Sequence, residues 1–250
     1  MSNPLIQYTL HLADNALILG QRNSEWTGHG PILEQDIAMS NISLDLIGQA
    51  RMLYQYAATL TGGDATEDSL AYLRNEQEYK NCLLSELGKG DWARTTLRQF
   101  FFSTYQFYLY HSLQNSKDHT LAAIAEKAIK EVTYHLRWSA EWVIRLGDGT
   151  SESHQRLEKA INDLWMYTGE LTTPTDYETL LSKQGIAVDP ASFKDQWIQK
   201  VKEVFGEATL IVPGNVWMQS GGKTGVHTEH LGYILTELQY LQKTFPGCEW

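Results

Sequence analysis

The sequence has 250 residues, 42% of them hydrophobic and 20% charged, which is enough to bury a large core in one large domain or two small ones. Its 30 acidic and 20 basic residues give a net charge of -10 at pH 7, which argues against nucleic acid and membrane surfaces as partners. Two distant cysteines, no leader pattern and no apolar run of about 18 residues predict a reduced, cytoplasmic protein.

Five long helices are predicted in the first 146 residues. Asn3 and Pro4 mark the start of the first, whose apolar rhythm continues to about Leu19. The second runs from Pro31 to about residue 60 and stops at a pair of glycines. The other three are expected at about 67–87, 92–113 and 120–146, with Asp91 capping the middle one.

The remainder of the chain is less regular, with helices predicted at about 151–167, 190–205 and 227–243 and a short extended piece at 208–212. No series of alternating strands and no repeat is visible. The sequence therefore predicts an all-α protein with one domain over 1–250. Its core is an up-and-down helix bundle over about 31–146, and a helical extension follows over about 151–250.

Polar side chains recur on the apolar stripes of the predicted helices. Glu131 and His135 share a stripe with Trp138, and Glu76 lies on a similar stripe of helix 67–87. A buried carboxylate needs a compensating charge or hydrogen bonds, and basic side chains on these helices are able to supply them. We therefore predict one buried polar network, formed by Asn41, Asp45, Glu76, Lys80, Arg98, Glu131 and His135.

The same pattern is close to the di-iron site of ferritin-like bundles, which take a Glu from each of two helices and a Glu-x-x-His pair from each of two others. Here Tyr79 and Tyr134 stand where the two histidines are required, and no Asp or Glu occurs between residues 92 and 115. At most three of six ligands are present. The sequence therefore predicts no metal, cofactor or catalytic residue in this chain.

Two more motifs lie near the C-terminus. His227 and His230 in HTEH share a helix face with a spacing that a metal could use, but no third ligand lies near them in the sequence. GGKTG at 221–225 contains the Gly-Lys-Thr of a phosphate loop, yet Trp217 occupies the place of its first glycine and no strand precedes it. A loop that holds an anion or a partner stays open as an alternative.

Seven aromatic residues lie between positions 100 and 110, all round the predicted helix, which indicates a helix buried on every side. Either this helix lies centrally under the C-terminal helices, or its rings form a subunit interface. The candidate interface aromatics are Phe100, Phe101, Tyr105 and Tyr108.

Several segments taken together are familiar, namely LDLIGQAR at 44–51, KEVTYHLRWS at 130–139, GIAVDP at 185–190, GGKTGVHTEHLG at 221–232 and ELQYLQ near the end. They resemble the PaaC family of bacterial phenylacetyl-CoA 1,2-epoxidase subunits, over essentially the whole chain. The resemblance implies a ferritin-like subunit without iron, which pairs with a homologous catalytic A subunit that carries the di-iron centre. It also implies that the complex epoxidises the ring of the CoA thioester in phenylacetate breakdown, with O2 and with electrons relayed from NADPH by a reductase.

Three functions are compatible with the sequence. The first is a non-catalytic structural subunit that pairs with the catalytic di-iron subunit and other epoxidase components. The second is a di-iron monooxygenase in its own right, using Asp45, Glu76, Glu131 and His135. The third is a stand-alone helical binding protein. Without its partner, a chain with an apolar surface made for a homologous bundle could also pair with itself as a homodimer.

Overall fold

The computed structural model describes residues 3–214 and 216–248, and all regular structure in these residues is helical, as predicted. Contacts cluster in two compact units, which we call unit 1 (Met1–Gly88 with Gly221–Trp250) and unit 2 (Lys89–Ser220). The C-terminal segment thus joins the N-terminal one, although the sequence placed it in an extension after residue 150. The single domain over 1–250 stays a prediction. In the part of the chain described, no helix combines the length and apolar character needed to cross a membrane.

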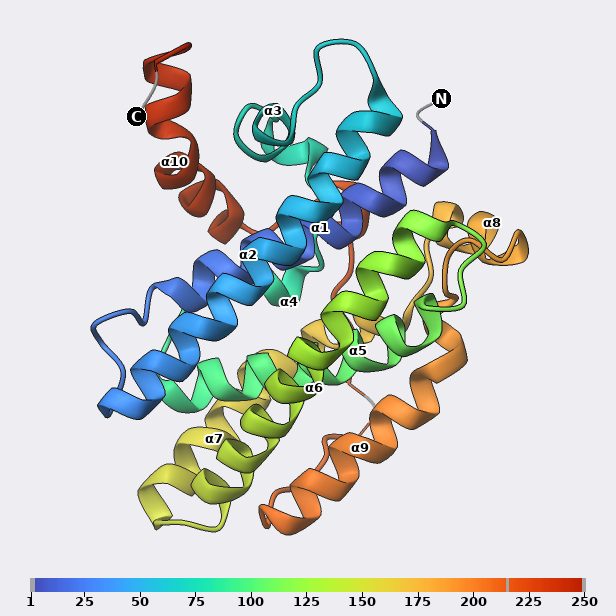
Figure 1. Cartoon of the computed structure of the whole chain (residues 1–250). Coiled ribbons are helices and arrows are strands. Elements are labelled where there is room, and N and C mark those ends of the chain that lie inside the picture. The colour runs from blue at the N-terminus through green and yellow to red at the C-terminus, as the bar shows by residue number, and fades with distance from the viewer. Residues whose placement is uncertain (1–2, 215, 249–250) are drawn as a thin grey trace. The chain divides into compact units, whose positions relative to one another are not determined.

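Unit 1 is built on two long helices, α1 (Pro4–Ser24) and α2 (Leu33–Thr61), which pack side by side (Figure 1). The start of α1 and the end of α2 are where local signals placed them, whereas α1 continues to Ser24, beyond the predicted end at about Leu19. The side chain of Asn3 accepts a hydrogen bond from the Leu5 amide at 3.0 Å, and α2 stops at Gly62, whose φ of 73° favours glycine. The short elements α3 (Glu67–Tyr72), η1 (Glu76–Glu78), α4 (Leu83–Glu86) and η5 (Gly222–Thr224) complete the unit together with α10 (Glu229–Thr244).

The prediction of one helix over 67–87 is wrong. Helix α3 ends at Tyr72, and Tyr79 and Cys82 have extended backbone, with ψ of 152° and 144°. Side chains of α1 bind the backbone here: Asp14 accepts from the Lys80 amide at 2.8 Å, and Asn15 accepts from the Cys82 amide at 2.8 Å. These bonds use backbone groups that a helix would pair internally. Side chains from α1 therefore override the local helical pattern.

Unit 2 is built on the pair α5 (Trp92–Leu113) and α6 (His119–Gly147), whose N-caps are Asp91 and Asp118. Around this pair lie α7 (Ser151–Leu164), η2 (Trp165–Tyr167), η3 (Gly169–Thr172), α8 (Asp176–Lys183), η4 (Pro190–Phe193) and α9 (Lys194–Glu207). The sequence did not predict α8, and the extended piece at 208–212 forms no strand.

The aromatic residues of α5 form the centre of unit 2. The ring of Phe101 packs against Trp165, Trp197 and Phe205, with centroid distances of 5.8–6.0 Å. The Trp197 indole also donates to the Phe101 carbonyl at 3.1 Å. Helix α5 therefore takes the central position that one of the two interpretations gave it.

This burial corrects the assignment of interface aromatics. Phe100, Phe101 and Tyr105 are at most 1% exposed, so no partner is able to reach their rings. Tyr108 is partly buried and stacks on Phe193 at 6.2 Å. Both ends of this contact belong to unit 2, where α7 and α9 pack on α5.

Candidate functional site

The seven predicted network residues are divided between the two units, with four in unit 1 and three in unit 2. Asn41 is exposed, and Asp45 lies half-buried on the same outward side of α2. The register was misjudged because α2 carries apolar residues on both sides. Its buried stripe includes Met39, Ile42 and Leu46. Spacing alone cannot say which of two apolar stripes faces the core.

Two more predicted members, Glu76 and Lys80, also leave the predicted network. Glu76 is exposed in η1, where no long helix exists to carry it inward. Lys80 is half-buried in the extended segment, and burial lowers the pKa of its amine. Lys80 makes its hydrogen bonds to α1 through its backbone: its amide donates to Asp14, and its carbonyl faces the Nδ1 of His11 at 2.7 Å.

The remaining three predicted members lie in unit 2 on the neighbouring helices α5 and α6. Arg98 and His135 are buried, and Glu131 is half-buried. Burial, together with the nearby charge of Glu131, raises the pKa of Tyr110 on α5 to about 12. These three residues keep the predicted position between long helices, and a network confined to unit 2 remains the prediction for them.

The donor set of a ferritin-like di-iron centre does not fit the side chains found here. Helix α5 carries no Asp or Glu along its entire length. Glu76 is on the surface, and Tyr134 is 37% exposed, with the Arg137 guanidinium 5.8 Å from its ring centre. Among residues 3–214 and 216–248, no three His, Cys, Asp or Glu side chains are placed to bind one metal ion.

Unit 1 instead contains a buried ionic cluster around Asp14, which is fully buried on α1. Its carboxylate accepts from the Tyr54 hydroxyl at 2.5 Å, from the Lys80 amide and from both terminal nitrogens of Arg74. Burial disfavours the charge on Arg74, but Asp14 outweighs it and holds the pKa of Arg74 above its ordinary value. Burial and the charge of Asp14 also raise the pKa of Tyr54, so this phenol stays protonated.

Tyr79 connects this cluster to α10. The Arg74 guanidinium lies 4.1 Å from the centre of the Tyr79 ring, and Gln239 of α10 donates to the Tyr79 hydroxyl at 2.9 Å. The same amide of Gln239 donates to the Arg74 carbonyl at 2.9 Å. Burial raises the pKa of Tyr79 to about 12, so its hydroxyl keeps its proton and donates to the Ala71 carbonyl at 2.6 Å.

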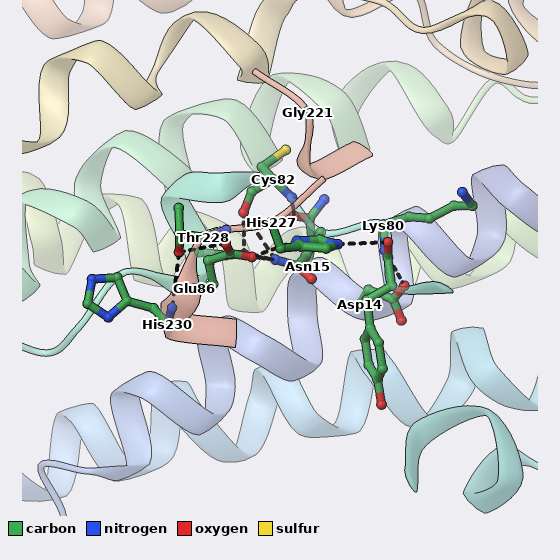
Figure 2. Close-up of polar contacts among 12 residues, drawn as sticks. Asp14, Asn15, Lys80, Cys82, Glu86, Gly221, His227, Thr228 and His230 are labelled. Atoms are coloured by element: carbon green, nitrogen blue, oxygen red, sulfur yellow. Dashed lines mark hydrogen bonds and ion pairs between the residues drawn. The ribbon is translucent and has the colours of Figure 1, made fainter. Parts of the chain in front are cut away.

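A second cluster is centred on Glu86, which is also fully buried. Figure 2 shows its carboxylate between Thr228 and His227. It accepts from the Thr228 amide at 2.6 Å and hydroxyl at 2.8 Å, from the Asn81 amide group at 2.7 Å and from the His227 Nδ1 at 2.8 Å. One buried carboxylate thus receives four hydrogen bonds from two separate segments of the chain.

His227 is held as an imidazolium by this geometry. Its Nδ1 faces the Glu86 carboxylate and its Nε2 faces the Tyr79 carbonyl at 2.9 Å. Only the protonated ring has an N–H for each of two acceptors. Burial alone lowers the pKa of His227, but the hydrogen bond and the charge of Glu86 raise it above the ordinary value. The side chains of both partners are completely buried.

The GGKTG segment now has a structural explanation. A Cβ atom at Gly222 would overlap the Asn81 carbonyl oxygen, and one at Gly225 would overlap the carbonyl oxygen of Gln77. Gly225 also has a φ of 91°, which disfavours other residues. The glycines thus let the loop lie directly on residues 77–83.

The two histidines of HTEH do not share a site. The His227 ring binds Glu86 and Tyr79, whereas His230 lies beside Gly88.

Sequence reasoning missed Asp14 and Glu86, although a signal for Asp14 was present. His11, Asp14 and Asn15 interrupt an otherwise apolar stretch of the first helix at helical spacing. A polar residue on an apolar stripe was also the signal that singled out Glu131. The first helix was not searched in this way because the predicted core began at about residue 31. The arrangement as a whole pairs its buried charges and ties α1, residues 74–86, the glycine loop and α10 into one unit.

Comparison with known proteins gives a consistent picture. The family model described as "Phenylacetic acid catabolic protein" matches residues 1–250. The C-type subunit of 1,2-phenylacetyl-CoA epoxidase from Escherichia coli (strain K12) is 48% identical over 248 residues, which are 99% of this chain and 100% of that protein. Both matches agree with the all-α, ferritin-like class that the sequence predicted. The chain belongs to the phenylacetic acid catabolic protein family.

Proposed function

We propose that this chain is the non-catalytic structural subunit of an oxygenase complex that epoxidises phenylacetyl-CoA in phenylacetate breakdown. It binds the homologous catalytic subunit, which holds the di-iron centre, and supports that subunit in its active arrangement. The relative from Escherichia coli is named as one subunit of an epoxidase, which supports the role in a complex. The acid-free helix α5 and the exposed Glu76 support a division of labour in which another chain supplies the iron ligands.

The observation that carries the proposal is the outward face of α2. Leu33, Ile37 and Leu44 are 72%, 52% and 66% exposed, and their spacing puts them on one side of the helix together with Gly48. Apart from the neighbouring backbone of its own helix, no heavy atom lies within 4 Å of a Cβ placed on Gly48. An exposed apolar stripe beside a glycine is typical of a surface that another helix covers. We infer that the catalytic subunit packs on this face.

The experiment is co-purification of the chain with a homologous catalytic subunit, with one charge placed on the stripe. Leu44→Asp is expected to abolish the complex while leaving the melting temperature of the isolated chain nearly unchanged, because the side chain is exposed. Leu180→Asp on α8 is the matched control, since Leu180 is 47% exposed and belongs to a different helix and a different unit from Leu44. Retention of the complex by Leu44→Asp would contradict the proposed surface.

Iron content and activity test the division of labour. The chain alone should contain no stoichiometric iron, and phenylacetyl-CoA should be epoxidised only by the assembled system. Stoichiometric iron in the isolated chain would instead favour a di-iron monooxygenase. A chain that ignores every catalytic subunit offered would favour a stand-alone binding protein.

A further inference from the structure

A pocket of about 190 Å³ lies in unit 1 between α1, α2 and α3. Its floor is apolar, and the floor residues Leu17, Ala50, Tyr54 and Ala71 are each at most 7% exposed. The other lining residues are Ile47, Arg51, Glu67, Asp68 and Tyr72, of which Arg51 and Asp68 are exposed and mark the mouth. An apolar interior with a few polar groups at its edge is typical of a small-molecule site.

The ring of Tyr54 is fixed in the floor of this pocket. Its hydroxyl donates to the buried Asp14 carboxylate at 2.5 Å, and the Arg74 guanidinium lies 5.6 Å from its ring centre. Because these partners hold the ring, the floor is already in place before a ligand arrives. A preformed site loses less conformational freedom when it binds.

The volume of the pocket limits the size of the ligand. An apolar cavity of about 150 Å³ is enough to hold benzene. At about 190 Å³, the pocket holds a single aromatic ring with a short side arm, and it is too small for a nucleotide. The Tyr54 ring in the floor offers such a ligand an aromatic contact.

The charges at the mouth favour a ligand with a positive charge. The Arg51 Nε donates to the Glu67 carboxylate at 3.0 Å, so these two charges neutralise each other. Asp68 forms no ion pair within residues 3–214 and 216–248, and its negative charge is left uncompensated at the pocket. This charge acts on the lining, since burial, and after it Asp68, raise the pKa of the Tyr72 hydroxyl. An ammonium group is therefore attracted here, and a carboxylate is repelled.

We propose that this pocket binds a protonated amine carried by a single aromatic ring, with the ring against Tyr54 and the ammonium group at Asp68. Because Tyr54 joins the pocket to the Asp14 cluster, the bound amine stabilises unit 1. The site does not depend on the proposed function, since its lining includes none of the α2 residues assigned to the catalytic subunit.

The test is isothermal titration calorimetry on the full chain alone, with benzylamine as the probe. Benzylamine should bind at one site with a dissociation constant of about 1 mM or lower. Benzoate has the same ring and the opposite charge, and propylamine has the charge without the ring, so each should bind at least about tenfold more weakly. The melting temperature should rise with the benzylamine concentration, because the ligand binds only the folded chain.

Three variants locate the site. Asp68→Asn should raise the dissociation constant of benzylamine about tenfold, because the attracting charge is removed. Asp64→Asn is the matched control, since Asp64 is exposed and does not line the pocket, and it should leave binding unchanged. Ala71→Leu fills the pocket and should abolish binding, with circular dichroism to check its folding. Asp68→Asn keeps the test decisive if the larger side chain disturbs the fold.

Three results would overturn the proposal: no benzylamine binding to the unaltered chain, benzoate binding as tight as that of benzylamine, or unchanged benzylamine affinity in Asp68→Asn. No catalytic subunit is present in this experiment, so its failure is separate from failure of the Leu44→Asp experiment.

Discussion

Replacing Asp14 by asparagine should remove much of the stability of unit 1. The substitution keeps the shape of the side chain but removes its charge, and it leaves the guanidinium of Arg74, only 8% exposed, without its counter-charge. One Asp14 oxygen accepts from Tyr54 and Arg74, and the other accepts from Arg74 and the Lys80 amide. In either orientation, the NH2 group of the asparagine side chain therefore faces groups that are themselves donors, and those hydrogen bonds are lost. Breaking a buried ion pair in this way costs about 3–5 kcal/mol.

The assay is urea unfolding followed by far-ultraviolet circular dichroism. Asp14→Asn and Arg74→Met should each lower the free energy of unfolding by about 3–5 kcal/mol. The double variant should lose less than the sum, because neither charge is then left buried alone. Asp64→Asn is the matched control, since Asp64 is exposed and its change should stay within about 0.5 kcal/mol.

Tryptophan fluorescence gives a second readout of the same experiment. All tryptophans except Trp26 and Trp250 fall within residues 89–220, so this signal reports mainly on unit 2. A loss of less than about 1 kcal/mol for Asp14→Asn, or strictly additive losses in the double variant, would refute the role assigned to the ion pair.

Three further outcomes are expected. The pKa of His227 is raised above 6.5 in the folded chain, so the stability that its protonation contributes is complete below pH 6.5 and is lost as the pH rises through the raised pKa. The melting temperature of the unaltered chain should therefore fall over this pH range, and that of His227→Gln should not show this fall. Gly225→Ala should lower the free energy of unfolding by about 1–3 kcal/mol because of its backbone conformation alone, and the overlap with the Gln77 carbonyl adds to this loss. Gly48→Ala, whose new methyl group meets no atom beyond its own helix backbone, should instead raise the free energy of unfolding by about 0.5–1 kcal/mol in urea unfolding. Glu131→Ala should lower the melting temperature without changing the iron content measured by elemental analysis, and an unchanged melting temperature would count against a network in unit 2.

Much of the site escaped prediction because its partners are far apart in the chain. Asp14 and Arg74 are 60 residues apart, and Glu86 and His227 are 141 residues apart. No periodicity within a helix reports such pairs. The motif GGKTGVHTEH was visible in the sequence, but its glycines and its first histidine acquire a meaning only when residues 77–86 lie against them.

Local interactions along the chain were sufficient to predict the helical class and the ends of several long helices, because caps such as Asn3 and Asp91 act within a few residues of their own position. Contacts between distant segments settled the rest. They broke the predicted helix over 67–87, turned Leu44 of α2 outward and gathered the buried charges of unit 1 around Asp14 and Glu86. The reason is physical: a buried carboxylate must find its donors wherever the fold supplies them, and here those donors outweighed the preference of a local segment for a helix.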